Sequence, residues 1–229
     1  MGLTPSQFPA FQVAKALLIA GRGHLFESPT KDIPHASSDI IAKDDLIPQF
    51  GFVGSTYDVR RVLVLGINPG NGPRASRSAA DAKMMPALHA FVSSPEETTY
   101  AVAMQAQMDA FPNWPASKEI GPILENEGIA RTEIAYANAN PYRAGKGESK
   151  DAFPSTDRER LAANGWVLPL LTALMPTIII AHGKKAADVI QHCNFRAKTL
   201  VYNRNRNQVL RSEANTKFKE QLRLALDGR

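Results

Sequence analysis

A short loop whose residue types suit ligand binding follows one of the most apolar runs of the sequence. The loop reads Gly66-Ile67-Asn68-Pro69-Gly70 and comes directly after the Val- and Leu-rich residues 62–65. Glycines allow a backbone to approach a ligand closely, and Pro69 restricts the turn. Because Asn68 precedes a proline, its backbone is biased toward an extended conformation that can present the amide to a cleft. We therefore expect the binding or catalytic site at this loop.

Two familiar phosphate-binding loops fit this sequence poorly. No Gly-Lys-Ser/Thr follows the glycines, which excludes a Walker A loop. The spacing Gly70-x-Gly72-x-x-Ala75 matches a relaxed dinucleotide fingerprint, but Pro73 interrupts it. No second strand ending in an acidic residue follows about twenty residues later, as that fingerprint requires. The remaining alternative to a binding loop is a purely structural corner between a strand and a helix.

The elements around the loop predict an α/β fold. Residues 60–67 alternate little between polar and apolar types, which is typical of a central parallel strand buried on both faces. Strands separated by helices imply right-handed crossovers, hence a three-layer α/β/α fold with a central, mainly parallel four-stranded sheet. Ligands bind such sheets outside the carboxyl ends of the strands. The other predicted strands are 131–138, 176–181 and 198–202, and the predicted helices are 8–20, 79–92, 97–111, 114–127, 157–174, 183–193 and 213–226.

We expect a single domain over residues 1–229. It would comprise an N-terminal helix and extended connection (1–59), a core (60–212) and a C-terminal helix (213–229). Residues 27–59 are rich in Pro, Asp, Ser and Gly, which predicts a long connection over the surface. Ser155 or Thr156 is expected to cap the helix that begins near residue 157.

The charge of the chain is concentrated at one end. The net charge is +5, and the residues from 196 onward carry nine Lys and Arg against three Asp and Glu. The preceding part is therefore close to neutral. A basic segment on a near-neutral body favours a phosphate-rich partner such as nucleic acid. A solvated terminal helix with ordinary surface lysines would show the same composition.

The composition also argues against several classes of protein. A lone cysteine, Cys193, cannot form a disulfide framework, a Cys-x-x-Cys zinc site or a four-thiolate iron–sulfur site within the chain. No His-Glu-x-x-His pair occurs, so we expect neither a metal nor a cofactor. No apolar stretch approaches the roughly 18 to 20 residues of a membrane helix, and no secretory signal is evident. We expect a monomeric cytoplasmic protein without a membrane partner, associated with the nucleoid if bacterial.

Three segments resemble motifs of the uracil-DNA glycosylase superfamily. Val64-Leu65-Gly66-Ile67-Asn68-Pro69-Gly70 is similar to the first motif of the mismatch-specific uracil/thymine glycosylases, which read Gly-Ile-Asn-Pro-Gly there. Ile134-Ala135-Tyr136-Ala137-Asn138 resembles the strand that ends in a base-reading Asn. Residues 178–187 are similar to the strand and Ala-rich helix that precede the last motif. The resemblance covers roughly residues 60–212.

The resemblance implies a DNA glycosylase of base excision repair. Such an enzyme would hydrolyse the N-glycosidic bond of uracil or a related base in single-stranded or mismatched DNA, after the base leaves the stack. Asn68 would orient the attacking water, and Asn138 would bind the O4 and N3–H edge of uracil. The rest of the base pocket would come from Gly66, Ile67, Pro69 and Gly70.

The last motif of the superfamily differs in this chain. Relatives have His-Pro-Ser or Asn-Pro-Ser after the last strand, whereas this chain reads Tyr202-Asn203-Arg204-Asn205-Arg206-Asn207. This difference favours one alternative, a non-catalytic nucleic-acid-binding protein on the same fold. A second alternative is an enzyme acting on free nucleosides or nucleotides. Arginine and amide side chains bind phosphates well. The expected DNA-binding residues are Asn203, Arg204, Asn205, Arg206, Arg211 and Lys184.

Overall fold

A five-stranded sheet forms the centre of the protein. The computed structural model describes residues 2–20, 47–67, 69, 79–142, 155–203 and 208–228, with the backbone alone for 79–81 and 208–211. The strand order is β1-β3-β2-β4-β5; β1 pairs antiparallel with β3, and the other pairs are parallel. All four predicted parallel strands are present, and β1 adds a fifth. The strands are β1 (Phe52–Val53), β2 (Val62–Gly66), β3 (Ile134–Asn138), β4 (Ile178–His182) and β5 (Lys198–Tyr202).

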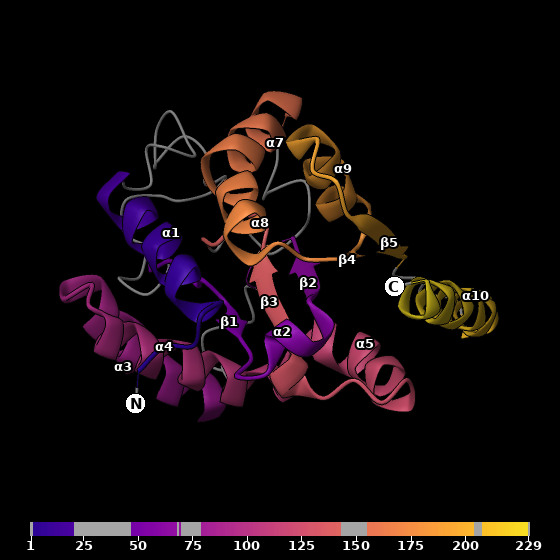
Figure 1. Cartoon of the computed structure of the whole chain (residues 1–229), viewed down its shortest axis with the longest axis horizontal. Coiled ribbons are helices and arrows are strands. Elements are labelled where there is room, and N and C mark those ends of the chain that lie inside the picture. The colour runs from indigo at the N-terminus through magenta and orange to yellow at the C-terminus, as the bar shows by residue number, and fades with distance from the viewer. Residues whose placement is uncertain are drawn as a thin grey trace.

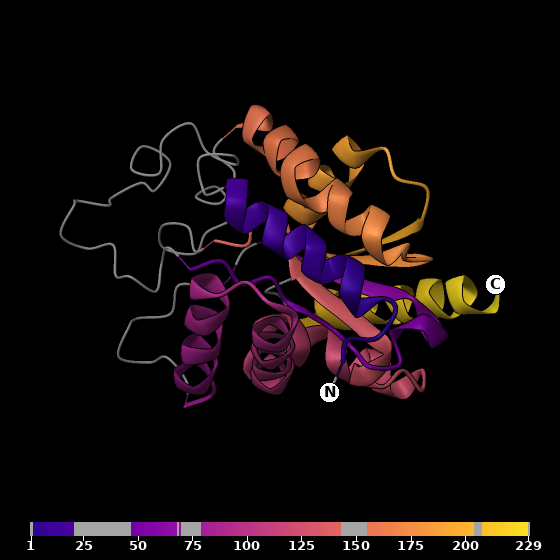
Figure 2. The same cartoon turned by 60° about the vertical axis from the view of Figure 1, so that its left-hand side comes forward.

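Helices cover both faces of the sheet, as the predicted three-layer fold requires. In two views related by a 60° rotation, α7, α8 and α9 lie on one side and α3, α4, α5 and α10 on the other (Figures 1 and 2). Helix α1 packs against α8 and α4. The helices are α1 (Gln7–Ala20), α2 (Tyr57–Arg60), α3 (Ala79–Ser93), α4 (Glu97–Ala110), η4 (Phe111–Asn113), α5 (Pro115–Asn126), η5 (Arg131–Glu133), α7 (Thr156–Ala162), η6 (Ala163–Val167), α8 (Leu168–Leu174), α9 (Lys184–Cys193) and α10 (Gln208–Asp227).

The strand order creates a switch point beside the predicted loop. From β2, the chain moves to β3 on one side and later returns past β2 to form β4 and β5 on the other. Neighbouring strands whose connections leave in opposite directions open a crevice at their carboxyl ends, where ligands bind in open α/β sheets. Here those strands are β2 and β4. The last residues of these two strands, Gly66 and His182, therefore mark the expected site.

Part of the segment predicted as a surface connection is buried. Residues 47–54 are all buried, and they include the short edge strand β1. Two glycines allow this close approach to β3. A Cβ on Gly51, whose φ is +83°, would lie 1.8 Å from the Tyr136 carbonyl oxygen, and a Cβ on Gly54 would lie 2.1 Å from that of Thr132. The prediction was therefore wrong for this part, because a two-residue strand is too short to show a periodic pattern.

The helix predicted at 157–174 is interrupted in its middle. Ser155 caps it, since its Oγ accepts the Arg158 N–H at 3.4 Å. Between α7 and α8, the π-helical segment η6 (Ala163–Val167) contains the fully buried Trp166. Such π segments occur frequently near functional sites, because the added residue changes the direction of a side chain. Among the described residues, no helix combines the length and apolar character needed to cross a membrane.

Candidate functional site

A row of residues crosses the carboxyl edge of the sheet on the face that α5 and α10 cover. The register pairs Gly66 with Asn138 and His182 with Tyr202, while Leu65 pairs with Ala181 one residue earlier. Side chains one register position apart point to opposite faces, and paired residues share a face. The row across β3, β2, β4 and β5 is therefore Asn138, Gly66, His182 and Tyr202.

The Asn138 amide is held in a defined orientation within this row. Its Oδ1 accepts the Tyr136 hydroxyl at 3.0 Å, and its backbone carbonyl accepts the Trp166 indole N–H at 2.8 Å. Asn138 is only 2% exposed, and the hydrogen bond of its side chain among the described residues engages Oδ1. Buried amide donors are normally satisfied. The side chain thus offers a donor, together with the second lone pair of Oδ1.

Gly66 is required by the side chains packed above it. A Cβ at this position would lie 2.5 Å from Asn138 Oδ1 and 2.8 Å from the Tyr136 hydroxyl. The sequence predicts a close approach of a ligand to the backbone at this glycine. In the structure, two side chains of the protein itself make the close approach. The absence of a Cβ at Gly66 therefore sets the position of the Asn138 amide.

Hydrogen bonds beyond the strand ends join the predicted loop to the segment after β3. The N–H of Ala139 donates to the Gly66 carbonyl and that of Asn140 to the Ile67 carbonyl, each at 2.8 Å. Asn140 is buried, and its Oδ1 accepts the Tyr142 N–H at 3.0 Å. Asn140 is not among the predicted site residues, although Asn140-Pro141 repeats the Asn-Pro pattern of the first loop.

The predicted catalytic residue itself falls outside the described residues. Asn68 and Gly70 are not among them, whereas Ile67 is half-buried and Pro69 is buried. The hydrogen bonds from Ala139 and Asn140 hold the segment after β3 against Gly66 and Ile67 at the end of β2. Of the predicted base pocket, the structure thus places Gly66 and Ile67 beside Asn138 and the residues that follow it, and Pro69 is buried.

A second buried amide lies near the same edge. Gln49 is 4% exposed, its backbone N–H donates to the Pro141 carbonyl at 2.8 Å, and its Nε2 has no hydrogen-bond partner among the described residues. It precedes the antiparallel strand β1, which places it beside the carboxyl end of β3. Leaving such a donor unsatisfied costs about 1–3 kcal/mol. Nothing in the sequence pattern of the connection signals Gln49.

The N-terminus of α9 begins at this edge. Gly183 has a φ of +103°, and a Cβ there would lie 3.4 Å from Ile67 Cδ1, so the ends of β4 and β2 are in close proximity. Lys184 is the first residue of α9 and is exposed. The first N–H groups of a helix lack intrahelical partners and carry a partial positive charge, which favours anions. The predicted phosphate contact of Lys184 is compatible with this position.

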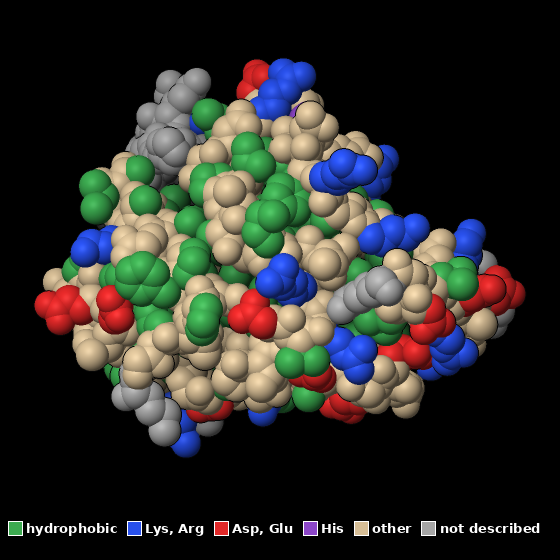
Figure 3. All heavy atoms as spheres, viewed as in Figure 1, with side chains coloured by type: hydrophobic (Ala, Val, Ile, Leu, Met, Phe, Trp, Pro, Cys, Tyr) green, Lys and Arg blue, Asp and Glu red, His purple; other side chains and the backbone are tan. Residues whose placement is uncertain are grey.

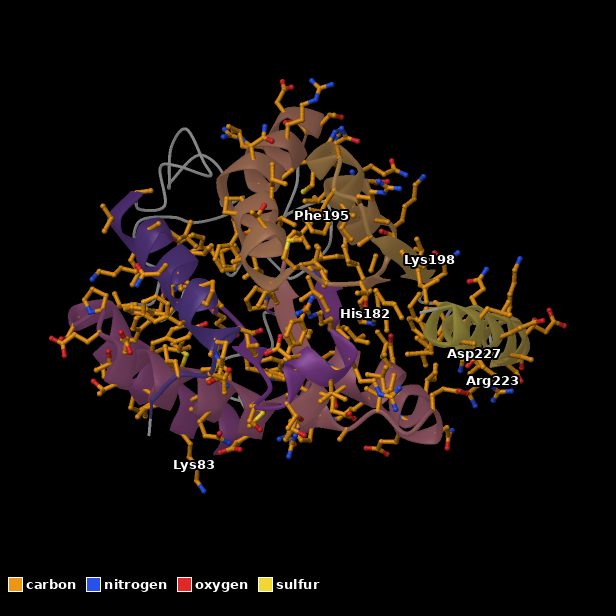
Figure 4. The ribbon with its side chains drawn as sticks, viewed as in Figure 1. Lys83, His182, Phe195, Lys198, Arg223 and Asp227 are labelled. Carbon is orange, nitrogen blue, oxygen red and sulfur yellow. The ribbon has the colours of Figure 1, made fainter. Side chains whose placement is uncertain are left out.

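His182 is held between two side chains. Its Nε2 lies 2.7 Å from Glu119 Oε2 on α5, and its side chain is 7% exposed. Its ring stacks on Tyr202 with centroids 5.8 Å apart, and the Tyr202 hydroxyl donates to Asn215 Oδ1 at 3.0 Å. Figure 4 shows His182 in the interior, between the sheet and α5. These contacts are typical of a structural histidine whose ring is hydrogen-bonded within the fold.

The predicted DNA-binding residues are described only in part. Asn203 is exposed directly after β5, next to the β4–α9 corner that carries Lys184. Arg204, Asn205 and Arg206 lie outside the described residues, as does the side chain of Arg211. Figure 3 shows several Lys and Arg side chains on the part of the surface formed by α9, β5 and α10. Among the described residues, no three His, Cys, Asp or Glu side chains are grouped to hold a metal ion.

The chain matches no protein-family model and no curated protein. Its function must therefore be inferred from the residues at the carboxyl edge and from their chemistry.

Proposed function

We propose that the protein is a DNA glycosylase that hydrolyses the bond between deoxyribose and uracil or a related base. The observation that carries the proposal is the Asn138 amide. It is buried at the carboxyl end of β3, one strand from the switch point between β2 and β4, and is oriented by the Tyr136 hydroxyl; its Nδ2 donates no hydrogen bond among the described residues. Buried polar groups that converge at such a crevice are typical of a small-ligand pocket.

The hydrogen-bonding capacity of Asn138 matches one edge of uracil. Nδ2–H can donate to the base O4, and the second lone pair of Oδ1 can accept N3–H. The bond from Tyr136 occupies the other lone pair and opposes rotation of the amide. A cytosine presents an amino donor where uracil has O4, so it would face Nδ2 with a donor. The arrangement therefore favours uracil over cytosine.

Asn68 would supply the positioned water. An amide is not a useful general base near neutral pH, so its role would be to orient the water. This suits a dissociative path, in which a cationic sugar requires only a weak nucleophile. Negative charge on the departing base would be stabilised by backbone N–H groups of the loop around residues 66–70.

A polymeric substrate is supported by the charges at the same edge. Lys184 and the N-terminus of α9 lie beside Ile67, and Asn203 follows the adjacent strand β5. Helix N-terminal N–H groups, Lys and Asn are common phosphate ligands. Phosphates that flank the extruded nucleotide could bind there, while the base enters next to Asn138.

The test is base release from oligonucleotides that contain one deoxyuridine, as single strands and in a G·U mismatch. We expect abasic sites with the intact protein and at least about a tenfold slower release with Asn68→Ala and with Asn138→Ala, a barrier change of about 1.4 kcal/mol. Asn126→Ala is the matched control, because Asn126 is exposed at the end of α5. Salt-sensitive binding without any release would refute the proposal and favour a non-catalytic nucleic-acid-binding protein.

A further inference from the structure

We propose that the groove between β5 and α10 binds the sugar–phosphate backbone of one nucleic-acid strand and guides it to the carboxyl edge. This inference rests on the proposed function for the identity of the polymer, but not on base release. The groove has a volume of about 460 Å³. Its walls are formed by β5 with Asn203 and by the face of α10 that carries Ala214, Lys217, Phe218, Gln221 and Leu224.

The charge of the groove has one sign. Lys198 and Lys217 line it, and none of its lining residues is acidic. Both lysines are exposed, and neither forms an ion pair within the described part of the chain. Arg223, also on α10, instead donates to Glu127 at 3.0 Å, and this ion pair raises the pKa of its guanidinium. The two groove lysines thus keep their charge available for an anionic partner.

Neutral donors lie between these charges. The Lys198 N–H donates to the Thr177 carbonyl, so it is directed toward β4. Because residues alternate along a parallel strand, the backbone N–H groups of Thr199 and Val201 point to the other edge of β5, which ends the sheet among the described residues. Backbone N–H, hydroxyl and amide groups contact phosphates in many nucleic-acid complexes. Gln221 on α10 supplies an amide.

The aromatic residues of the groove do not serve base stacking. Tyr202 is 2% exposed and Phe218 is 3% exposed, and their rings pack edge to face with centroids 5.3 Å apart. A stacking platform needs an exposed ring face. The groove would therefore contact the backbone and sugars, with Leu224 as apolar surface, and would discriminate little between base sequences.

The direction of the groove connects it to the candidate site. At a rise of about 3.3 Å per residue, β5 extends over about 13 Å from Lys198 to Tyr202. Its carboxyl end reaches Asn203, beside the β4–α9 corner with Lys184. A strand lying in the groove would thus arrive at the edge where Gly66 and Asn138 lie.

The experiment measures binding of a fluorescein-labelled oligothymidylate by anisotropy at several KCl concentrations. For single strands, each lost phosphate contact makes the negative slope of log affinity against log salt concentration shallower by about 0.7. Near 0.1 M salt this corresponds to about a fivefold loss of affinity. We expect this change for Lys198→Gln and for Lys217→Gln. Lys83→Gln is the matched control, since Lys83 projects from α3 at the opposite side of the molecule (Figure 4). Thermal unfolding verifies that each variant is folded.

Two results would overturn the inference. One is an unchanged salt slope in both groove variants. The other is displacement of the oligonucleotide by polyglutamate of equal charge at equal concentration, which would indicate a surface for acidic peptides. If the intact protein releases no base but its oligonucleotide binding depends on the groove lysines, the glycosylase proposal alone is refuted. Base release and binding that are both insensitive to the groove lysines would refute the groove alone.

Discussion

Replacing Gly66 by alanine tests whether packing at the end of β2 sets the position of the Asn138 amide. The new Cβ would lie 2.5 Å from Asn138 Oδ1 and 2.8 Å from the Tyr136 hydroxyl, so both side chains must move. Breaking their buried 3.0 Å hydrogen bond costs about 1–3 kcal/mol. Forcing each side chain off its rotamer costs about 0.5–1.5 kcal/mol, and lower entropy of the unfolded chain returns about 0.4–1 kcal/mol. We expect a net loss of about 1–6 kcal/mol in the free energy of unfolding, with a midpoint of about 3 kcal/mol.

Urea unfolding followed by tryptophan fluorescence measures this loss. Trp114 reports on the region, because its ring lies 5.2 Å from that of Tyr136. Tyr136→Phe breaks the same hydrogen bond without adding a Cβ, so it should lose only about 1–3 kcal/mol. In the Tyr136→Phe background, Gly66→Ala should lower the free energy of unfolding by less than it does in the parent protein, since the hydroxyl that lies 2.8 Å from the new Cβ is gone.

Base release supplies an independent measurement on the same variants. If Asn138 binds the base, Gly66→Ala should slow release by at least about tenfold, even in urea-free buffer where the variant remains folded. If the free energy of unfolding of Gly66→Ala is within about 0.5 kcal/mol of that of the parent and base release is unchanged, Gly66 does not set the position of the Asn138 amide.

Two further predictions concern buried side chains near the sheet. Trp166→Phe should lower the free energy of unfolding by about 2–4 kcal/mol and slow base release, because the indole N–H that donates to the Asn138 carbonyl at 2.8 Å is lost. The control is Trp114→Phe, which removes an indole without a hydrogen bond among the described residues and should lower the free energy of unfolding in urea by less. Equal losses in the two variants would contradict the role of the Trp166 hydrogen bond. Burial raises the pKa of the Cys193 thiol to about 12 from 9.0. Labelling of the native protein by iodoacetamide, measured by mass spectrometry, should therefore be about a thousandfold slower than labelling in urea, and its rate should rise about tenfold per pH unit from pH 7 to 10. Rapid labelling of the native protein would show that the thiol is accessible.

The parallel part of the fold could be predicted because each strand carries its own signal. Residues of β2, and of β4 up to Ala181, are apolar on both faces, and each of these strands is entirely buried. The edge strand β1 could not be found in this way. Its two residues, Phe52–Val53, are held by glycine-mediated contacts with β3, which depend on residues about eighty positions away.

The candidate site could be predicted at the level of strand ends. The position of Asn138 at the carboxyl end of β3, paired with Gly66, follows from the parallel register. Its hydrogen bonds do not, because Tyr136 and Trp166 reach it through side-chain packing and through the π segment. Gln49 was missed for a similar reason: only the tertiary fold brings it beside Pro141. The role of Asn68 stays a prediction.

The π segment η6 also fixes the rotational phase of the helix that contains it. Each residue of an α-helix turns the chain by about 100°, and a π turn accommodates one residue more than an α turn. Deleting one residue from Ala163–Val167 would give a continuous helix in which α7 is rotated by about 100° relative to α8. Glu159 on α7 would then face away from Lys185 and from His192, which now lies 3.5 Å from it. The number of residues in this helix therefore cannot change by even one without moving Glu159, whereas a surface loop tolerates such a change.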